Sequence, residues 1–288
     1  MNQTQINEQT IVCSDQITLA ATLFRPSSEL KGAVLIGPAT GIKRQFYASF
    51  ASYLSDNGYG VLTFENRGIG DSNQGLLTDN TVTLQSWGEK DLTAAFEHLK
   101  AQFPDAKYHL VGHSAGGQLI GLMPNAHQLS SVFNFACSSG CLANMSLINK
   151  FKAHFFMNFF IPLNNLLFGH TKSQLVGMGE PLPKQVARQW RHWCNGSGYV
   201  KMAFGRTVHQ HWYDELAMPS MWVNAVDDYI AINENVADMI SVFSQMPAQT
   251  LTLDPKDHDL SEIGHMKFFS RQSQKLWPLA TDWLSKHA

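Results

Sequence analysis

The chain has 288 residues, 44% hydrophobic and 15% charged, which is enough to bury the core of a single α/β domain. The formal net charge is −2 and the basic residues are scattered, apart from Lys43 and Arg44, so nothing favours nucleic acid or an anionic membrane as a partner. The four cysteines match no zinc spacing and residues 1–10 are too polar for a secretory signal, so we expect reduced thiols, no metal or cofactor, and a cytoplasmic location.

The first half of the chain predicts a hairpin and then strands that alternate with helices. Residues 10–15 and 17–24 form the expected hairpin, with Ser14 and Asp15 at its turn. Short continuous apolar runs are typical of strands buried on both faces, and they occur at 32–37, 60–65 and 108–112. Helical spacing or position between a strand and a proline predicts helices at 46–54, 92–103 and 115–123.

The second half continues this alternation after a long interval. Strands are expected at 131–136, 220–225 and 249–254, and a last helix at 272–286, in which Pro278 should cause a kink or displace the start. The whole pattern predicts an α/β fold: a mainly parallel sheet of about eight strands with helices on both faces.

The interval between Ala136 and Ser220 holds about 80 residues, far more than a connection between a strand and a helix needs. Its apolar segment 151–168 contains Lys152 and is interrupted by Pro162, so we do not expect it to span a membrane. We interpret the interval as a mostly helical cap insertion. The expected domains are a core, 1–140 with 214–288, and the insertion, 141–213.

A serine flanked by glycines follows the strand at 108–112 directly and precedes a helix. Such a tight turn strains the backbone at Ser114 and requires small residues two positions before and after it, which Gly112 and Gly116 provide. The turn would hold the hydroxyl at the carboxyl edge of the sheet, where the helix N-terminus favours developing negative charge. We therefore expect Ser114 to be a nucleophile rather than part of a packing turn.

A serine nucleophile needs a base and an acid that orients the base, and in this type of fold they follow in the order Ser, Asp or Glu, His. Asp227 and Asp228 come after the strand at 220–225, and His265 comes after the last strand. His258 is the rival base because it lies nearer to that strand. The order of the residues indicates a catalytic triad.

These segments resemble the α/β-hydrolase superfamily, and within it a bacterial group of predicted serine hydrolases whose substrate is unassigned. The resemblance extends over nearly the whole chain and rests on "IGPATG", "FENRGIGDS", "LVGHSAGG", "NAVDDYIA" and "IGHMKFF" leading into "LWPLATDWL". It implies Ser114 as nucleophile, an aspartate of "VDDY" as acid and His265 as base. Counted from Pro219, the acid of the superfamily pattern falls on Asp228, with Asp227 as the alternative.

The chain departs from the superfamily pattern at two places: Gly37-Pro38 stands where His-Gly is common, and Glu65 precedes "NRGIG". An oxyanion hole needs two backbone N–H groups, and Pro38 has none. We expect the donors to be Ala115, which follows the nucleophile, and Ala39, with Thr40 as second choice.

Several other features receive structural rather than functional interpretations. Gly68 and Gly70 lack the third glycine of a dinucleotide loop. We expect Arg67 to be a structural hydrogen-bond donor and His113 to pack beside the nucleophile. His209 and His211 lack the partner spacing of a metal site.

The sequence thus predicts a serine hydrolase that cleaves an ester or thioester of an apolar acyl group through an acyl-enzyme. An amidase, peptidase or acyltransferase on the same triad is the alternative, and a non-catalytic binding protein is a further one. The expected partner is a small-molecule apolar ester. The apolar pocket rests on side chains that the insertion should bring over the nucleophile: Phe155, Phe156, Phe159, Phe160, Leu163, Leu166, Leu167 and Phe168.

Overall fold

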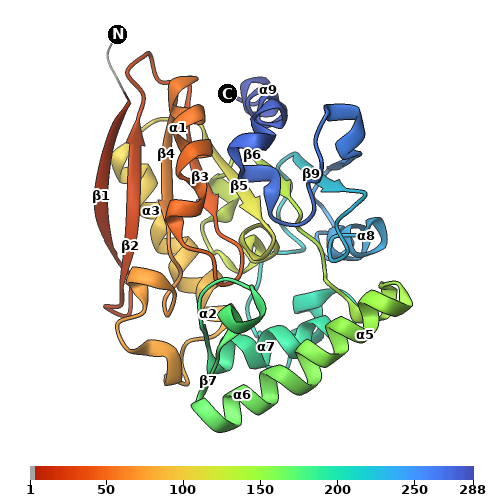
Figure 1. Cartoon of the computed structure of the whole chain (residues 1–288). Helices are drawn as coiled ribbons and strands as arrows, with labels where there is room; N and C mark the ends of the chain where they lie inside the picture. The colour runs from red at the N-terminus through yellow and green to blue at the C-terminus, as the bar shows by residue number, and fades with distance from the viewer. Residues whose placement is uncertain (1–3) are drawn as a thin grey trace.

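An eight-stranded sheet forms the centre of the computed structural model, which describes residues 4–288 (Figure 1). The first three residues of the polar N-terminal stretch lie outside the described residues. The strands follow the spatial order β1-β2-β4-β3-β5-β6-β9-β10. Their bounds are β1 Gln5–Val12, β2 Thr18–Arg25, β3 Gly32–Gly37, β4 Tyr59–Phe64, β5 Tyr108–His113, β6 Ser131–Phe135, β9 Ser220–Ala225 and β10 Ala248–Leu253.

Strand direction matches the expectation of a mainly parallel sheet. Only β2 runs antiparallel to its neighbours, β1 and β4, and the six strands from β4 to β10 are parallel to one another. β3, β4 and β6 are buried along their whole length because helices cover both faces, which is why their sequences are continuous apolar runs. The predicted hairpin is present, and it extends further towards the N-terminus than its apolar residues indicate.

The helices of the core cover the two faces of this sheet, with α1 in front and α3 behind in the view of Figure 1. α1 buries Phe50 and Leu54, two of the apolar residues that predicted it. Pro278 is the first residue of α9, so it displaces the start of the last helix and does not kink it. The bounds are α1 Ala48–Asp56, α2 Leu84–Ser86, α3 Thr93–Gln102, α4 Ala115–Gln118, α8 Asn233–Ile240 and α9 Pro278–Lys286.

The helix expected at 115–123 is shorter than predicted. α4 ends at Gln118 and a 3₁₀ turn follows at Ile120–Leu122. The Tyr213 hydroxyl donates to the Gln118 carbonyl at 2.6 Å, and the Trp212 amide donates to the Gly121 carbonyl at 2.7 Å. Donors at the end of the insertion thus bind the carbonyls to which amides of a longer helix would have donated. Because these donors lie far away in the chain, the local sequence does not predict where α4 ends.

The insertion contains α5 Leu147–Phe155, α6 Ile161–Phe168 and α7 Lys184–Cys194, with a hairpin of β7 His170–Thr171 and β8 Leu182–Pro183. A π-turn, Phe156–Phe160, joins α5 to α6 without a break, so the expectation that Pro162 interrupts the segment is wrong. The π-helical turn ends two residues before Pro162, which stands in the first turn of α6, where a missing N–H is tolerated. Within residues 4–288, no helix is long and apolar enough to cross a bilayer.

The phenylalanines and leucines expected to line a pocket lie mostly at the surface. Only Phe156 and Phe160 are half-buried, where they stack on each other and Phe156 contacts Trp190. The other six have exposed fractions between 39% and 81%: Phe155, Phe159, Leu163, Leu166, Leu167 and Phe168. The expectation of an apolar pocket lined by these six is therefore wrong, because their side chains lie on sides of the helix that point away from the core.

Candidate active site

Ser114 lies in the turn between β5 and α4, with backbone angles φ 47° and ψ −115°. A side chain other than glycine is strained at a positive φ, and such strain is typical of a serine held up at a strand-to-helix turn. The strand fixes the residue from one side, because the Ser114 amide donates to the Phe135 carbonyl at 3.1 Å. The residue is half-buried.

The two glycines around the serine are required by close backbone contacts. A Cβ at Gly112 would come within 2.6 Å of Gly117 Cα, and one at Gly116 would come within 1.9 Å of the Gly37 carbonyl oxygen. The second contact also shows that the end of β3 lies directly against the turn. The need for small residues, inferred from the sequence, thus has a specific cause at each position.

Ser114, His265 and Asp228 form a chain of hydrogen bonds, although they come from distant parts of the sequence. His265 Nε2 lies 3.1 Å from Ser114 Oγ, and His265 Nδ1 lies 2.8 Å from Asp228 Oδ2. Both distances are within the reach required for proton transfer from the serine and for orientation of the imidazole by the carboxylate. The arrangement can therefore act as nucleophile, base and orienting acid.

Asp228 is buried, and it accepts the amides of Ile230 and Ala231 at 2.8 and 3.0 Å on its other oxygen. Burial alone would raise the pKa of Asp228, but the His265 ring and these amides outweigh it and hold the pKa below its ordinary value. The carboxylate stays ionised, as a group that stabilises an imidazolium must.

The neighbouring Asp227 turns to the other side and holds the loop that carries the histidine. Its two oxygens accept the amides of Ile263 and Gly264, each at 2.9 Å. Asp228, not Asp227, is thus the carboxylate in contact with His265. The rival base His258 is half-buried in a 3₁₀ turn at Pro255–His258 and is not part of this hydrogen-bond chain.

Two backbone amides near Ser114 are candidates for an oxyanion hole. Within residues 4–288, the amides of Ala115 and Thr40 donate to no protein acceptor. The Ala39 amide instead donates to the Tyr47 hydroxyl at 2.9 Å. The Ala39 amide, the expected donor from the loop after β3, is thus already hydrogen-bonded to Tyr47. The Thr40 amide, the second choice, has no acceptor within the described residues.

Tyr47 belongs to a buried chain that the sequence did not reveal. Its hydroxyl lies 2.9 Å from His113 Nδ1, and His113 Nε2 lies 3.0 Å from the backbone carbonyl of His265. Burial and the nearby His265 lower the pKa of His113 to about 3, so its ring is neutral. Tyr47 then donates to Nδ1, and Nε2–H donates to the carbonyl. The loop after β3 and the histidine loop are thereby connected.

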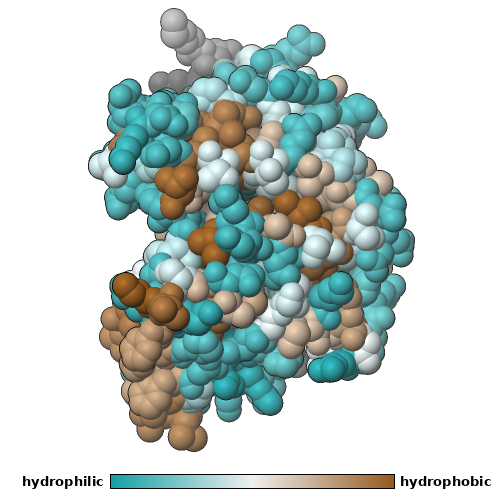
Figure 2. Space-filling view, turned by 90° about the vertical axis from the view of Figure 1, so that its right-hand side faces the viewer, coloured by the Kyte–Doolittle hydropathy of each residue, from teal (hydrophilic) through white to brown (hydrophobic). Residues whose placement is uncertain are grey.

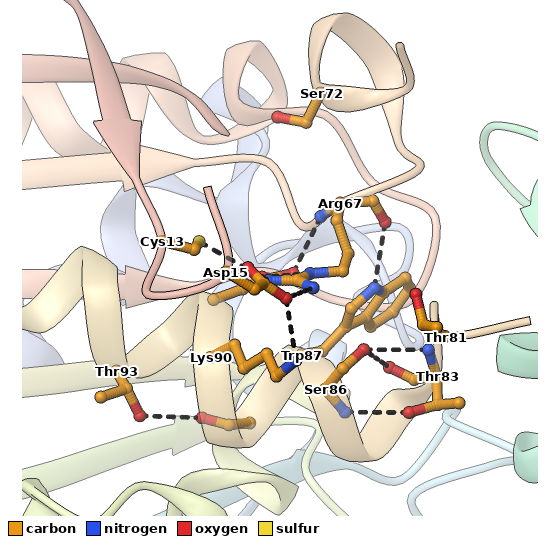
Figure 3. A network of polar contacts seen from close by, with 12 residues as sticks. Cys13, Asp15, Arg67, Ser72, Thr81, Thr83, Ser86, Trp87, Lys90 and Thr93 are labelled. Atoms are coloured by element: carbon orange, nitrogen blue, oxygen red, sulfur yellow. Dashed lines mark hydrogen bonds and ion pairs between the residues drawn. The ribbon is translucent and has the colours of Figure 1, made fainter. Parts of the chain in front are cut away.

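Arg67 has the structural role expected for it, within a separate network of polar contacts (Figure 3). Its buried guanidinium donates to Asp91 at 2.6 Å and to Asp15 at 2.7 Å. Its carbonyl accepts the indole N–H of Trp87 at 3.1 Å. These contacts connect the hairpin turn, the loop after β4 and the helical segment before α3.

No group of His, Cys, Asp and Glu within residues 4–288 is placed to hold a metal ion. His211 stacks on Phe204, with ring centroids 3.7 Å apart. Four cysteines are buried and form no disulfide within residues 4–288: Cys13, Cys137, Cys141 and Cys194.

Comparisons with known proteins agree with this architecture. A model of the family described as serine aminopeptidase, S33, matches residues 28–176, a segment that includes Ser114 but ends before Asp228 and His265. The phospholipase ABHD3 of Mus musculus is 21% identical over 282 residues, which cover 88% of this chain and 61% of that protein. The chain thus spans about three fifths of the length of this curated relative.

Solved structures show the same fold at low identity. DcsB in complex with its substrate analogue aligns with a TM-score of 0.66 at 12% identity, over 99% of this chain and 100% of that chain. The Pyrococcus furiosus esterase Pf2001 aligns with a TM-score of 0.62 at 11% identity, over 99% and 92%. At such identities the likeness establishes the fold and not the substrate.

Proposed function

This chain belongs to the serine aminopeptidase S33 family of the α/β-hydrolase superfamily, and we propose that it is a serine hydrolase acting on an ester or thioester of an apolar acyl group. The observation that carries the proposal is the position of His265, whose two ring nitrogens lie 3.1 Å from Ser114 Oγ and 2.8 Å from Asp228 Oδ2. A binding protein without catalysis would not need a strained serine next to an oriented base.

In the proposed mechanism, His265 removes the proton from Ser114 Oγ as this oxygen attacks the substrate carbonyl. The amide of Ala115 and an amide of the loop after β3, Ala39 or Thr40, stabilise the oxyanion. His265 then gives its proton to the leaving group, and an acyl-enzyme remains. Water, deprotonated by the same histidine, releases the acid and restores the serine.

The choice of ester over peptide rests on charge and on exposed apolar side chains. An aminopeptidase needs an acidic group to hold the substrate ammonium, and the only acidic residue of the insertion, Glu180, pairs with Lys43 at 3.1 Å. Val226 and Tyr229 flank the two aspartates and are 61% and 53% exposed. These side chains, rather than the helix at 147–168, are the proposed contacts of an apolar acyl group.

Amide or peptide hydrolysis is the second candidate, because the family description names an aminopeptidase. Acyl transfer to an acceptor other than water would use the same steps. A cytoplasmic location is part of the proposal. It is supported by the four buried cysteines, which form no disulfide within the described residues.

The first experiment is fluorophosphonate labelling and ester hydrolysis by the wild type and Ser114→Ala. We expect the wild type to be labelled and active, and the variant to be folded, unlabelled and almost inactive, because the reacting oxygen is gone. Substantial turnover by Ser114→Ala, with labelling elsewhere in the chain, would show that another residue is the nucleophile.

The second experiment compares kcat/KM for 4-nitrophenyl esters from acetate to laurate with that for aminoacyl nitroanilides. Each added methylene contributes about 0.8 kcal/mol when buried, so kcat/KM should rise up to about fourfold per methylene until the site is full. Nitroanilides that are cleaved faster than the esters would favour the peptidase. A profile that falls from acetate onwards would remove the apolar acyl group from the proposal.

A further inference from the structure

One face of the helix at 147–168 exposes an unbroken line of large apolar side chains. We call this line the outer ridge: Leu147, Phe151, Phe155, Phe159, Leu163 and Leu167. Their exposed fractions lie between 39% and 84%. Figure 2 shows an apolar protrusion at the lower left of the molecule, where the front of the insertion of Figure 1 comes into view. Exposed apolar surface of this extent is typical of an interaction site.

The ridge is a regular feature of the helix and not a set of isolated exposed residues. Its members follow one another at every fourth position, and the π-turn Phe156–Phe160 reduces the drift that this spacing has in a straight α-helix. From Met157 onwards the opposite side is packed, since Met157, Ile161 and Asn164 are buried, whereas no residue of α5 is buried. The second half of the helix therefore has a core-facing side of its own, and the ridge is an additional apolar side whose members remain 39–84% exposed.

The insertion that bears this ridge has a charge opposite to that of the rest of the chain. Residues 141–213 contain eight Lys and Arg and one acidic residue, a formal charge of +7. The remaining residues contain 13 Lys and Arg and 22 Asp and Glu, a formal charge of −9, and the two values sum to the −2 of the whole chain. The near-neutral total thus hides a strongly basic region.

Part of this positive charge lies directly beside the apolar helix. Lys152 is exposed next to Phe151, and Lys172 Nζ lies 3.6 Å from the centre of the Phe168 ring. A cavity of about 350 Å³ joins Ile161 and Leu166 to three basic residues of α7: Lys184, Arg188 and Arg191. The basic residues of α7 thus lie along one side of the helix, next to the exposed Leu166, and Lys152 lies on the helix itself.

We propose that this surface docks the protein on an anionic phospholipid bilayer. The helix lies in the plane of the interface, with the outer ridge at the boundary between headgroups and acyl chains and the basic residues at the lipid phosphates. A second copy of the chain fits less well, because a symmetric contact through the ridge would bring two regions of +7 together.

The test is co-sedimentation of the full-length protein with vesicles of phosphatidylcholine alone and with about one third phosphatidylglycerol. We expect strong binding to the anionic vesicles, weaker binding to the neutral ones, and a decrease as NaCl rises from about 0.1 to 0.5 M. Ser114→Ala should bind like the wild type, so that the result is independent of the proposed hydrolysis. Equal binding to both vesicle types, or no binding, would overturn the proposal.

Variants separate the ridge and the charge from the rest of the surface. Phe151→Ser with Phe155→Ser and Phe159→Ser should weaken binding to anionic vesicles more than tenfold, because the inserted apolar area is lost. Its control, Ile6→Ser with Val12→Ser, removes exposed apolar side chains from β1 and should leave binding unchanged. Lys152→Glu should weaken binding about fivefold or more, and Lys256→Glu, on the core, should not.

Thermal unfolding checks that each variant is folded, and short-chain ester hydrolysis does so for every variant except Ser114→Ala. A ridge variant that is folded and binds anionic vesicles like the wild type would overturn the proposal. So would a wild type that is dimeric without lipid in sedimentation velocity and becomes monomeric in the ridge variant, because the ridge would then be a dimer interface.

Discussion

Two adjacent aspartates in this chain perform different tasks. Asp228 contacts the imidazole of His265, whereas Asp227 accepts two backbone amides of the loop on which that imidazole is carried. The two aspartates lie in the turn that follows β9 and reach different partners, so one residue can orient the base while its neighbour holds the loop of the base.

This division predicts different consequences for the two asparagine substitutions. Asp228→Asn should lower kcat for an ester on the order of 10⁴-fold, the size of the effect in the best-studied triad, because the amide cannot stabilise the imidazolium. Asp227→Asn should lower kcat much less but reduce the free energy of unfolding by about 1–3 kcal/mol, because an amide can accept only one of the two N–H groups on its oxygen. Kinetics and urea unfolding of both variants would check this, and a larger kcat loss in Asp227→Asn would reverse the assignment.

The lowered pKa of Asp228 gives a prediction about acid stability. A carboxyl group whose pKa is lower in the folded state binds fewer protons there than when unfolded, so it stabilises the fold above the unfolded pKa of about 3.9 and loses this effect as the pH falls through the folded value. The difference in free energy of unfolding between the wild type and Asp228→Asn should therefore be full near pH 5 and shrink below about pH 4. Urea unfolding at several pH values measures it, and a difference that is constant or grows towards acid would show that the Asp228 carboxylate does not stabilise the fold through its lowered pKa.

The residues of the candidate site differ in how far sequence could locate them. Ser114, Asp228 and His265 follow strand ends in a recognisable order, and the structure brings these three into hydrogen-bonding distance. Tyr47 has no such pattern, since it is one aromatic residue among several in the helical stretch after β3. Its link to Ala39 depends on how that helix packs, which is a property of the tertiary structure.

At the scale of elements, the end of β3 lies in close contact with the start of α4. This contact positions the candidate oxyanion amides near Ser114. Gly116→Ala would place a Cβ 1.9 Å from the Gly37 carbonyl oxygen, so one of the two segments must move. We expect a loss of about 1–3 kcal/mol in stability and about 10²-fold in kcat, because the oxyanion donors separate.

The matched control for this substitution is Gly177→Ala. A Cβ at Gly177 meets nothing within 4 Å, although its φ of +71° is strained for alanine. This variant should lose about 1 kcal/mol of stability and retain the kcat of the wild type. Equal kcat losses in the two variants would mean that the contact with Gly37 has no role in catalysis.

The helix at 147–168 shows what a periodic pattern can and cannot predict. Its helical conformation is indicated by composition and spacing, but a helix with apolar residues on two sides does not reveal which side meets the core. The packing of Met157 and Ile161 decides this, and it leaves the phenylalanines of the outer ridge outside. The shortened α4 is a second case, because the competing donors come from Trp212 and Tyr213, almost 100 residues away in the chain.

At the scale of the whole molecule, the fold was predictable because it depends on the sum of many local patterns. The alternation of buried strands and helices is enough to predict a mainly parallel sheet of eight strands, and small errors in element ends do not change it. Charge behaves differently, since a total of −2 is compatible with any distribution. The +7 of residues 141–213 becomes visible only when charge is counted over the segment that carries α5, α6 and α7.

The contact between the insertion and the loop after β3 has a consequence for protein engineering. The Glu180 amide donates to the Gly41 carbonyl at 2.8 Å, and the Glu180 side chain pairs with Lys43. In a chimera that exchanged only residues 141–213 for those of a relative, the Gly41 carbonyl would have to accept from the backbone of the relative. Gly41 directly follows Thr40, one of the candidate oxyanion donors. The transplantable module is therefore discontinuous, and the loop at 39–43 must be exchanged with the insertion for the graft to preserve turnover.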